Sequence, residues 1–291
     1  MLIDLHIHSK TCSDGNLTVE EIIREAKARN INLISITDHD SIGCQKKAMN
    51  LAKKNQISYI YGIELNISFS HPDFNNGKPA SLDLLGYQFD INNKPLKKKL
   101  EQIRQYREER AAKILENLNT EFKKEGHKNF TKNDLTKIQN SADGTLGRPH
   151  IADYMINKGI VADRKEAFEK YLLKCNVPKY PLYLKEASIL LRNAGGIFVL
   201  AHPNDPYGTS LTKLTKSLQE QTTIIKESML PYIDGIECWH SRNTTETTTH
   251  YLNFSRKHGL IMTGGSDCHQ KPIVMGTVQI PDWVADQFAK I

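Results

Sequence analysis

Near the start of the chain, the segment Leu2-Ile-Asp-Leu-His-Ile-His8 alternates between apolar and polar residues from Ile3 onward. A period of two is typical of a β-strand with one buried face. The apolar side chains face one way, while Asp4, His6 and His8 face the other, and Asp14 follows in the next loop. The segment therefore predicts a strand that ends in two imidazoles, with a carboxylate close behind.

Downstream of this strand, residues 1–93 alternate between predicted strands and helices. Thr18-Val-Glu-Glu21 is a capping box, and it predicts a helix to about residue 29. A second helix is predicted over 45–55, and further strands over 33–37, 57–64 and 82–89. This order predicts parallel strands joined by helical crossovers.

Residues 94–182 have a different texture, rich in lysine and glutamate and without strand patterns. Apolar residues recur there at helical spacing, which predicts helices over 95–125, 132–139, 149–157 and 164–174. Strand patterns return over 197–201, 234–238 and 259–263, and a polar helical stretch covers 209–229. We therefore expect an α/β domain with seven strands, built from 1–93 and 183–291, and a helical insertion or lid subdomain at 94–182.

The composition indicates more about the cellular compartment of the protein than about its activity. The 291 residues carry a formal net charge of +6, which can attract phosphate-bearing ligands and can equally be a lysine-rich solvated surface. The five cysteines include no CxxC pair, which indicates a reducing compartment, so we expect a cytoplasmic protein. The N-terminus lacks a signal-peptide pattern and no apolar run is long enough to span a membrane, so no membrane partner is expected.

Histidine and acidic residues gather where the predicted strands end. Besides the first strand and its loop, these positions are His39, Glu64, His202, Asp267 and His269. The carboxyl ends of parallel barrel strands meet on one face, so the side chains should converge there. Imidazole and carboxylate ligands suit zinc, manganese and iron. An isolated HxH is more often a pair of core or surface histidines. The co-occurrence of five histidines and three acidic residues at predicted strand ends and in the loops after them instead predicts a metal centre.

Six segments together resemble one family, the PHP (polymerase and histidinol phosphatase) superfamily. They are HIHSKTCSDG (6–15), ITDHDS (36–41), GIEL (62–65), GRPHIA (147–152), AGGIFVLAHP (194–203) and GGSDCH (264–269). Within the family, the SDG after HxH and the GRPH segment resemble stand-alone phosphoesterases. That branch includes nucleoside 3′,5′-bisphosphate phosphatases and 5′-3′ exonucleases of short RNA. Histidinol phosphatases usually have a histidine near the position of Asp14.

The resemblance implies a distorted seven-stranded TIM-like (β/α) barrel that holds two or three divalent metal ions (Mn, Zn or Fe). One ion would be bound by His6, His8, Glu64 and Asp267; a second by Glu64, His202 and a fourth-strand ligand; a third by Asp14, His39 and His269. The family commonly has a histidine as the fourth-strand ligand, whereas this chain has Asp83 there. Aspartate can ligate a metal, so the second site can persist with harder character.

The implied activity is hydrolysis of a small phosphomonoester by a metal-activated hydroxide. The substrate is expected to be a nucleotide, such as a nucleoside 3′,5′-bisphosphate or the 5′ end of short RNA. No Ser-His-Asp or catalytic-cysteine signature competes with this mechanism. Arg148 and His150 are candidates for binding the substrate phosphate, although Arg148 can equally be a surface residue at a helix start. His240 is a candidate for protonating the leaving group.

Two other functions fit parts of the sequence. A metal-dependent amidohydrolase also carries HxH on its first strand, but it usually has a strand-four lysine or an equivalent bridging ligand. A catalytically silent PHP domain would use its metals for structure or partner recognition. A dedicated nucleic-acid binder fits less well, because the lysines of 94–125 are interleaved with glutamate and no aromatic platform is evident. We therefore expect no stable nucleic-acid complex.

Overall fold

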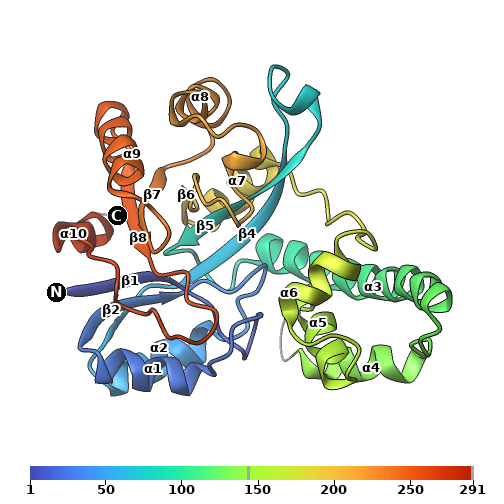
Figure 1. Ribbon diagram of the computed structural model, residues 1–291. Coiled ribbons are helices and arrows are strands. Elements are labelled where there is room, and N and C mark those ends of the chain that lie inside the picture. Colours follow the sequence, from blue (N-terminus) through green and yellow to red (C-terminus); the bar gives the residue numbers. More distant parts are fainter. Residues whose placement is uncertain (143–144, 290–291) are drawn as a thin grey trace.

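The computed structural model describes residues 1–142 and 145–289, and within them eight strands form two sheets (Figure 1). The three-stranded sheet has the order β1 (Leu2–Ile7), β2 (Ile31–Ile36) and β3 (Ser58–Tyr59). The five-stranded sheet has the order β4 (Gly62–Phe69), β5 (Ala80–Tyr87), β6 (Ile197–Leu200), β7 (Gly235–His240) and β8 (Ile261–Gly265). The strand expected over 57–64 is thus divided between the two sheets.

The direction of β5 corrects the expectation of parallel strands throughout. β5 is antiparallel to both β4 and β6, whereas β1–β2, β2–β3, β6–β7 and β7–β8 are parallel pairs. The segment between β4 and β5 contains only a short 3₁₀ turn (Asn75–Gly77), and parallel strands need a longer crossover connection. The short connection therefore makes β4 and β5 a hairpin.

The two sheets lie edge to edge, but they do not form one continuous ladder of seven strands. At one edge, Asp267 N–H donates to His6 O (2.8 Å), next to β1 and β8. At the other, Glu64 N–H donates to Asp38 O (3.2 Å). Gly62 permits this approach of β4 to β2, because a Cβ there would lie 2.1 Å from Ser35 Oγ. The expected seven-stranded barrel is therefore not confirmed, although the fold is mixed α/β as expected.

Helices cover the outer faces of the sheets (Figure 1). α1 (Val19–Ala28) begins at the expected capping box of Thr18 and Glu21, and with α2 (Gln45–Lys54) it packs on the three-stranded sheet. The five-stranded sheet is covered by α7 (Leu184–Asn193), α9 (Thr245–His258) and α10 (Trp283–Ala289). The helix expected over 209–229 is confined to a 3₁₀ turn (Leu211–Lys213), α8 (Leu218–Ile224) and a π turn (Ile225–Met229).

The segment expected to be helical lies to one side of the sheets, drawn green to yellow in Figure 1. It contains α3 (Lys94–Glu125), α4 (Lys132–Ser141), α5 (Arg148–Asn157), and α6 (Arg164–Ala167) with a π turn (Phe168–Leu172). Leu118, Phe122 and Tyr171 belong to a hydrophobic cluster of its own, whereas Leu96 and Ile103 of α3 join the main core. α3 thus connects the two cores. None of the helices in the described residues is long and apolar enough to cross a membrane.

Candidate metal centre

Glu64 of β4 lies at the centre of the candidate site and is fully buried. Its Oε1 lies 3.4 Å from His6 Nε2 and 3.1 Å from His202 Nε2. Its Oε2 lies 3.1 Å from His8 Nε2 and 2.9 Å from His39 Nδ1. A carboxylate surrounded by four imidazoles is suited to bridge metal ions.

All nine residues expected to bind metal fall into four overlapping groups, in each of which the ligand atoms lie within 4.8 Å of one another. The groups are His8, Asp14, His39 and His269; His6, His8 and Asp267; His6, Glu64 and His202; and His39, Glu64 and Asp83. The grouping differs from the expected one, because Asp83 lies with His39 rather than with His202. The antiparallel course of β5 explains how a residue inside that strand reaches the site.

The backbone around the site is held in an unusual conformation. Gly265 lies so close to β1 that a Cβ there would be 2.3 Å from His6 Cβ, so glycine is required for β8 to approach His6. His202 and Asp267 have positive φ angles of 24° and 53°. Such backbone costs about 1–3 kcal/mol per residue and persists where the surroundings enforce it. The strain is placed at two of the proposed ligands.

The donor atoms fit divalent metal ions better than they fit one another. Among the described residues, His8 Nδ1, His202 Nδ1, Glu64 Oε2 and Asp267 Oδ1 are buried without a hydrogen-bond partner. Buried polar atoms are nearly always hydrogen-bonded, so such a concentration points to a missing partner. In addition, His6 Nε2 lies 3.1 Å from His8 Nε2, which requires a proton or a cation between the two nitrogens.

The charges of the metal-free site are strongly coupled. Burial lowers the pKa of His39 and His202, but the Glu64 carboxylate outweighs burial and raises both pKa values to about 9. Burial acts to raise the pKa of Asp267, yet His269 and His6 hold that pKa well below its usual range. Asp267 is therefore ionised, and His39 and His202 carry protons that a metal ion would have to displace.

Glu237 of β7 is a part of the site that sequence reasoning missed. Its Oε1 lies 3.0 Å from His6 Nδ1, and its Oε2 accepts a hydrogen bond from His202 N–H (2.7 Å). A carboxylate behind a metal-binding histidine fixes the ring orientation and the tautomer. Glu237 is fully buried, and a glutamate inside an apolar strand segment was the available signal, because such residues are rarely buried without a partner.

Asp83 is the one proposed ligand that departs from the family pattern. Its Oδ1 accepts a short hydrogen bond from Asn66 Nδ2, and burial together with Glu64 raises its pKa. His71, from the β4–β5 connection, lies elsewhere. Its Nε2 is 3.4 Å from Glu227, its ring packs on Phe74, and it joins none of the metal-ligand groups. Of these two residues, Asp83 is the one that joins a metal-ligand group of the described residues, so it remains the proposed fourth-strand ligand.

The three residues expected to handle the substrate are placed differently from one another. Arg148 turns into the helical segment, where Nη1 donates to Leu172 O (3.3 Å) and the guanidinium covers the Phe168 ring. His150 lines a cavity of about 240 Å³ together with Asp14. His240 is buried, with Nε2 3.5 Å from Asp267 Oδ2. Only His150 shares a cavity with a proposed ligand.

A cationic cluster that the sequence did not reveal lies between α3 and the sheets. Lys179, Arg107 and Arg110 line a narrow space beside Asp40. Arg107 pairs with Asp40 and donates to Leu146 O (3.3 Å), and Arg110 donates to Val177 O (2.6 Å). Lys179 has no ion pair within 4 Å among the described residues. Burial lowers the pKa of Lys179, and the Asp83 carboxylate opposes that shift.

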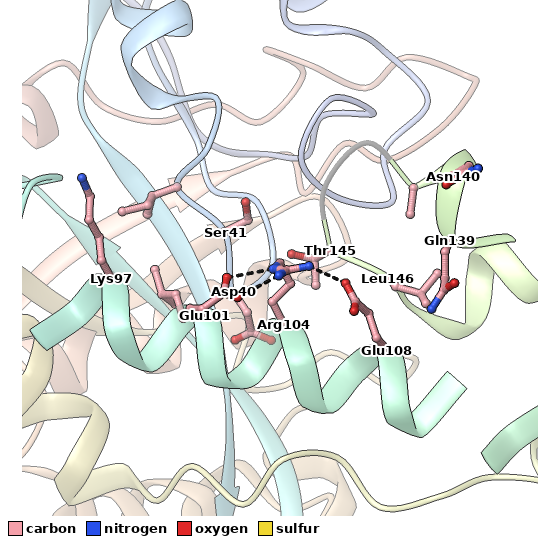
Figure 2. Close-up of a pocket in the computed structure, with 13 residues that line it drawn as sticks. Asp40, Ser41, Lys97, Glu101, Arg104, Glu108, Gln139, Asn140, Thr145 and Leu146 are labelled. Carbon is pink, nitrogen blue, oxygen red and sulfur yellow. Dashed lines mark hydrogen bonds and ion pairs between the residues drawn. The ribbon is translucent and has the colours of Figure 1, made fainter. Parts of the chain in front are cut away.

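A cavity of about 560 Å³ opens between the loop after β2 and the helices α3 and α4 (Figure 2). Asp40, Ser41 and Thr145 line one part of it, and Lys97 and Arg104 another. Figure 2 shows Arg104 between Glu101 and Glu108, with which it forms ion pairs along α3. Asp40 directly follows the proposed ligand His39 in the chain, although none of the nine proposed ligands lines this cavity.

Two cysteines form a separate group near the centre. Cys12 and Cys44 lie with Asp38, all three buried, and Cys44 Sγ donates to Asp38 Oδ2 (3.1 Å). Asp38 also accepts hydrogen bonds from Ser9 N–H (2.6 Å) and Ser9 Oγ–H (2.7 Å). These contacts fasten the loop after β1 to the loop after β2. Cys268 is buried between two proposed ligands and joins none of the metal-ligand groups.

Comparison with known proteins gives a family and several relatives. The PHP domain model matches residues 4–176. The 3′,5′-nucleoside bisphosphate phosphatase of Chromobacterium violaceum is 28% identical over 283 residues, covering 92% of this chain and 87% of that protein. The 5′-3′ exoribonuclease of Haemophilus influenzae is 30% identical over 207 residues, covering 69% of this chain and 68% of that protein.

Solved structures agree with these sequence relatives. A structure described as a metal-dependent phosphoesterase of Bifidobacterium adolescentis superposes with a TM-score of 0.79 at 26% identity, covering 98% of this chain and 94% of that one. A structure of Chromobacterium violaceum described as an amidohydrolase, with sulfate bound and no metal, gives a TM-score of 0.78 at 25% identity, covering 98% and 93%.

Proposed function

Because the chain belongs to the PHP domain family, we propose that Glu64 and the eight other residues of the four metal-ligand groups hold two or three divalent metal ions for its reaction. The chain is a metal-dependent phosphoesterase, a hydrolase of phosphate esters. The observation that supports the metal proposal most strongly is Glu64, which lies within 3.4 Å of four imidazole nitrogens. Manganese, zinc and iron all suit such ligands.

When bound, divalent ions supply the activation of water at neutral pH and offset the charge of the phosphoryl oxygens. The residues of the chain hold and orient these groups. Glu237 fixes the ring of His6 through the 3.0 Å contact to Nδ1. We assign substrate phosphate to Lys179, whose ammonium has no carboxylate partner, rather than to Arg148, whose guanidinium is engaged with Leu172 O and Phe168. We place His240 behind Asp267, as a residue that orients it.

The substrate we propose is a nucleotide, either a nucleoside 3′,5′-bisphosphate or the 5′ end of a short RNA. Two sequence relatives bear names with these substrates. The cavity beside Asp40 supports the proposal, because about 560 Å³ can take a nucleoside as well as a phosphate. We expect binding to be transient, with no stable nucleic-acid complex.

The same proposal covers the architecture and the setting of the protein. In it, the two sheets act together as one open, distorted barrel, supported by the backbone hydrogen bonds that join them at both edges. Residues 94–182 act as a subdomain over the mouth of the barrel, supported by their separate hydrophobic cluster. The free state of all five cysteines, each buried in the described part of the chain, is consistent with the cytoplasm.

The test is phosphate release by manganese-reconstituted protein across a panel of substrates. The panel contains nucleoside 3′,5′-bisphosphates, nucleoside monophosphates, histidinol phosphate and short 5′-phosphorylated RNAs, with His8→Ala as the control. We expect turnover of one nucleotide class, abolished by chelation and by the substitution. Turnover of histidinol phosphate alone would contradict the proposed substrate.

An amidohydrolase is the second candidate, because one superposing structure bears that description. A set of small amides and lactones, tested with the same reconstituted protein, separates the two activities. We expect no hydrolysis of these compounds, measured as amine release from the amides and as acid formation from the lactones. Amide hydrolysis without phosphate release would favour the second candidate, whereas metal binding without either activity would favour a silent metal-binding module.

A further inference from the structure

Arg242, in the loop that follows β7, connects three strands of the five-stranded sheet at the site. Its guanidinium forms two hydrogen bonds with Asp205, through Nε to Oδ1 (3.0 Å) and Nη2 to Oδ2 (2.7 Å). Nη2 also donates to Asp267 Oδ2 at 2.6 Å. Asp205 follows β6, and Asp267 follows β8. One arginine therefore ties a proposed metal ligand to the loop beside another.

Asp205 is a rigid anchor for this arginine. Its carboxylate is fully buried, and its Oδ1 accepts a further hydrogen bond from Tyr207 N–H (3.0 Å). Its backbone N–H donates to His202 O (3.0 Å), and its carbonyl accepts from Ser210 Oγ–H (2.6 Å). The anchor and the ligand His202 consequently move as one unit.

The two oxygens of Asp267 have different surroundings. Oδ2 receives the hydrogen bond from Arg242. Oδ1 lies 3.3 Å from His6 Nε2, 3.4 Å from His8 Nε2 and 3.2 Å from His269 Nδ1, and is buried without a hydrogen-bond partner among the described residues. Only Oδ1 therefore faces the place where imidazole nitrogens converge.

We propose that Arg242, anchored by Asp205, is a positioning residue that holds Asp267 so that it ligates metal through Oδ1 alone. This inference rests on the proposed metal centre. The bidentate contact with Asp205 fixes the plane of the guanidinium more strictly than a lysine could be fixed, and so aims Nη2 at Asp267 Oδ2.

The experiment is equilibrium dialysis of the full chain against Mn²⁺, with Arg242→Gln, Arg242→Lys and Asp205→Asn. Removing an outer partner of a metal ligand typically weakens affinity about 10–100-fold, which we expect for Arg242→Gln. We expect smaller losses for Arg242→Lys, which keeps the charge but not the fork, and for Asp205→Asn. Thermal unfolding of the metal-free variants checks that each is folded.

Arg192→Gln is the matched control. Arg192 is 39% exposed in its side chain, against 38% for Arg242, and it also pairs with an aspartate, Asp234, at 2.7 Å. That pair lies outside the metal-ligand groups, so Mn²⁺ affinity should not change.

Three outcomes overturn the inference. If Arg242→Gln binds Mn²⁺ as tightly as the wild type, Arg242 does not position a ligand. If affinity is unchanged but KM rises, Arg242 contacts substrate instead. If the wild type binds no Mn²⁺, the proposed metal centre fails and this inference fails with it. Should Arg242→Gln not fold, weaker Mn²⁺ binding by Arg242→Lys and Asp205→Asn supports the inference, and unchanged binding overturns it.

Discussion

The sheets around Glu64 and the helical segment 94–182, called here the sheet side and the helical side, differ in how their charged groups are paired. On the sheet side, imidazoles and carboxylates are buried, and several of their donor atoms have no hydrogen-bond partner among the described residues. On the helical side, several cations are neutralised by neighbouring carboxylates. Arg104 pairs with Glu101 and Glu108, Arg164 with Asp153, and Arg107 with Asp40.

This difference shows where binding energy for a ligand can come from. The imidazoles and carboxylates of the sheets are grouped so that a cation can take the place of the protons between them. The paired cations of the helices gain less from a phosphate, because each must first give up a carboxylate. Few cations of the segment 94–182 therefore remain to bind a substrate phosphate. Lys179 is the first candidate among them.

The largest effect should come from Glu64→Gln, on the sheet side. The neutral amide cannot bridge two cations, so we expect kcat to fall at least about 10³-fold and the protein to lose bound metal. Phosphate release and the metal content after dialysis measure the two effects.

Glu227→Gln is the control for that substitution, since Glu227 contacts only His71, outside the metal-ligand groups. Retention of full metal content and activity by Glu64→Gln would show that the sheet side does not act as a metal centre.

A smaller effect should follow Lys179→Met, on the helical side. Loss of the cation that faces Asp83 removes attraction for a substrate phosphate, so we expect KM to rise about 10–100-fold while Mn²⁺ affinity is retained. Steady-state kinetics with the best substrate of the panel measure this change. Lys174→Met is the control, because Lys174 pairs with Glu121 on the outer face of the helices. An unchanged KM for Lys179→Met would move phosphate recognition to another residue.

Whether a residue lies at a strand or in an irregular segment explains whether the sequence could predict its role. His6, His8 and Asp267 follow strands, so local patterns predicted them and the strand order brought them together. Lys179 and Arg242 lie in irregular segments, and their roles depend on contacts with Asp83 and Asp205, far away in the chain. The direction of β5 was also missed, because an apolar strand pattern is the same for a parallel and an antiparallel neighbour.

A further effect concerns the stability of the metal-free protein in alkali. The pKa values of His39 and His202, about 9 in the folded state, lie above the unfolded value of about 6.5. The stabilisation is thus complete below pH 6.5 and is lost as the pH rises through 9. We expect the Tm in chelator to fall by at least about 3 °C between pH 7 and 9.5.

The helical side gives the contrast for this measurement. Hydrogen bonds from Lys124 and Lys174 lower the pKa of Glu121 to about 2, so that carboxylate titrates only in acid. An alkaline loss of Tm therefore reports on the sheets. With Mn²⁺ bound, the ligand imidazoles are deprotonated, so the rise in Tm caused by Mn²⁺ should grow with pH. A flat Tm over this range in chelator would show that the imidazoles carry no extra protons.

The smallest effect should come from Arg104→Ala, in the wall of the large cavity of Figure 2. Arg104 is about half exposed and already paired with two glutamates, and such surface pairs contribute about 0–1 kcal/mol. We expect little change in the free energy of unfolding and less than about a twofold change in KM, because the guanidinium is not available to a phosphate. Urea unfolding and steady-state kinetics measure both. A tenfold rise in KM would instead show that phosphate displaces Glu101 and Glu108 from Arg104, and the helical side would then take a larger part in recognition than its internal pairing suggests.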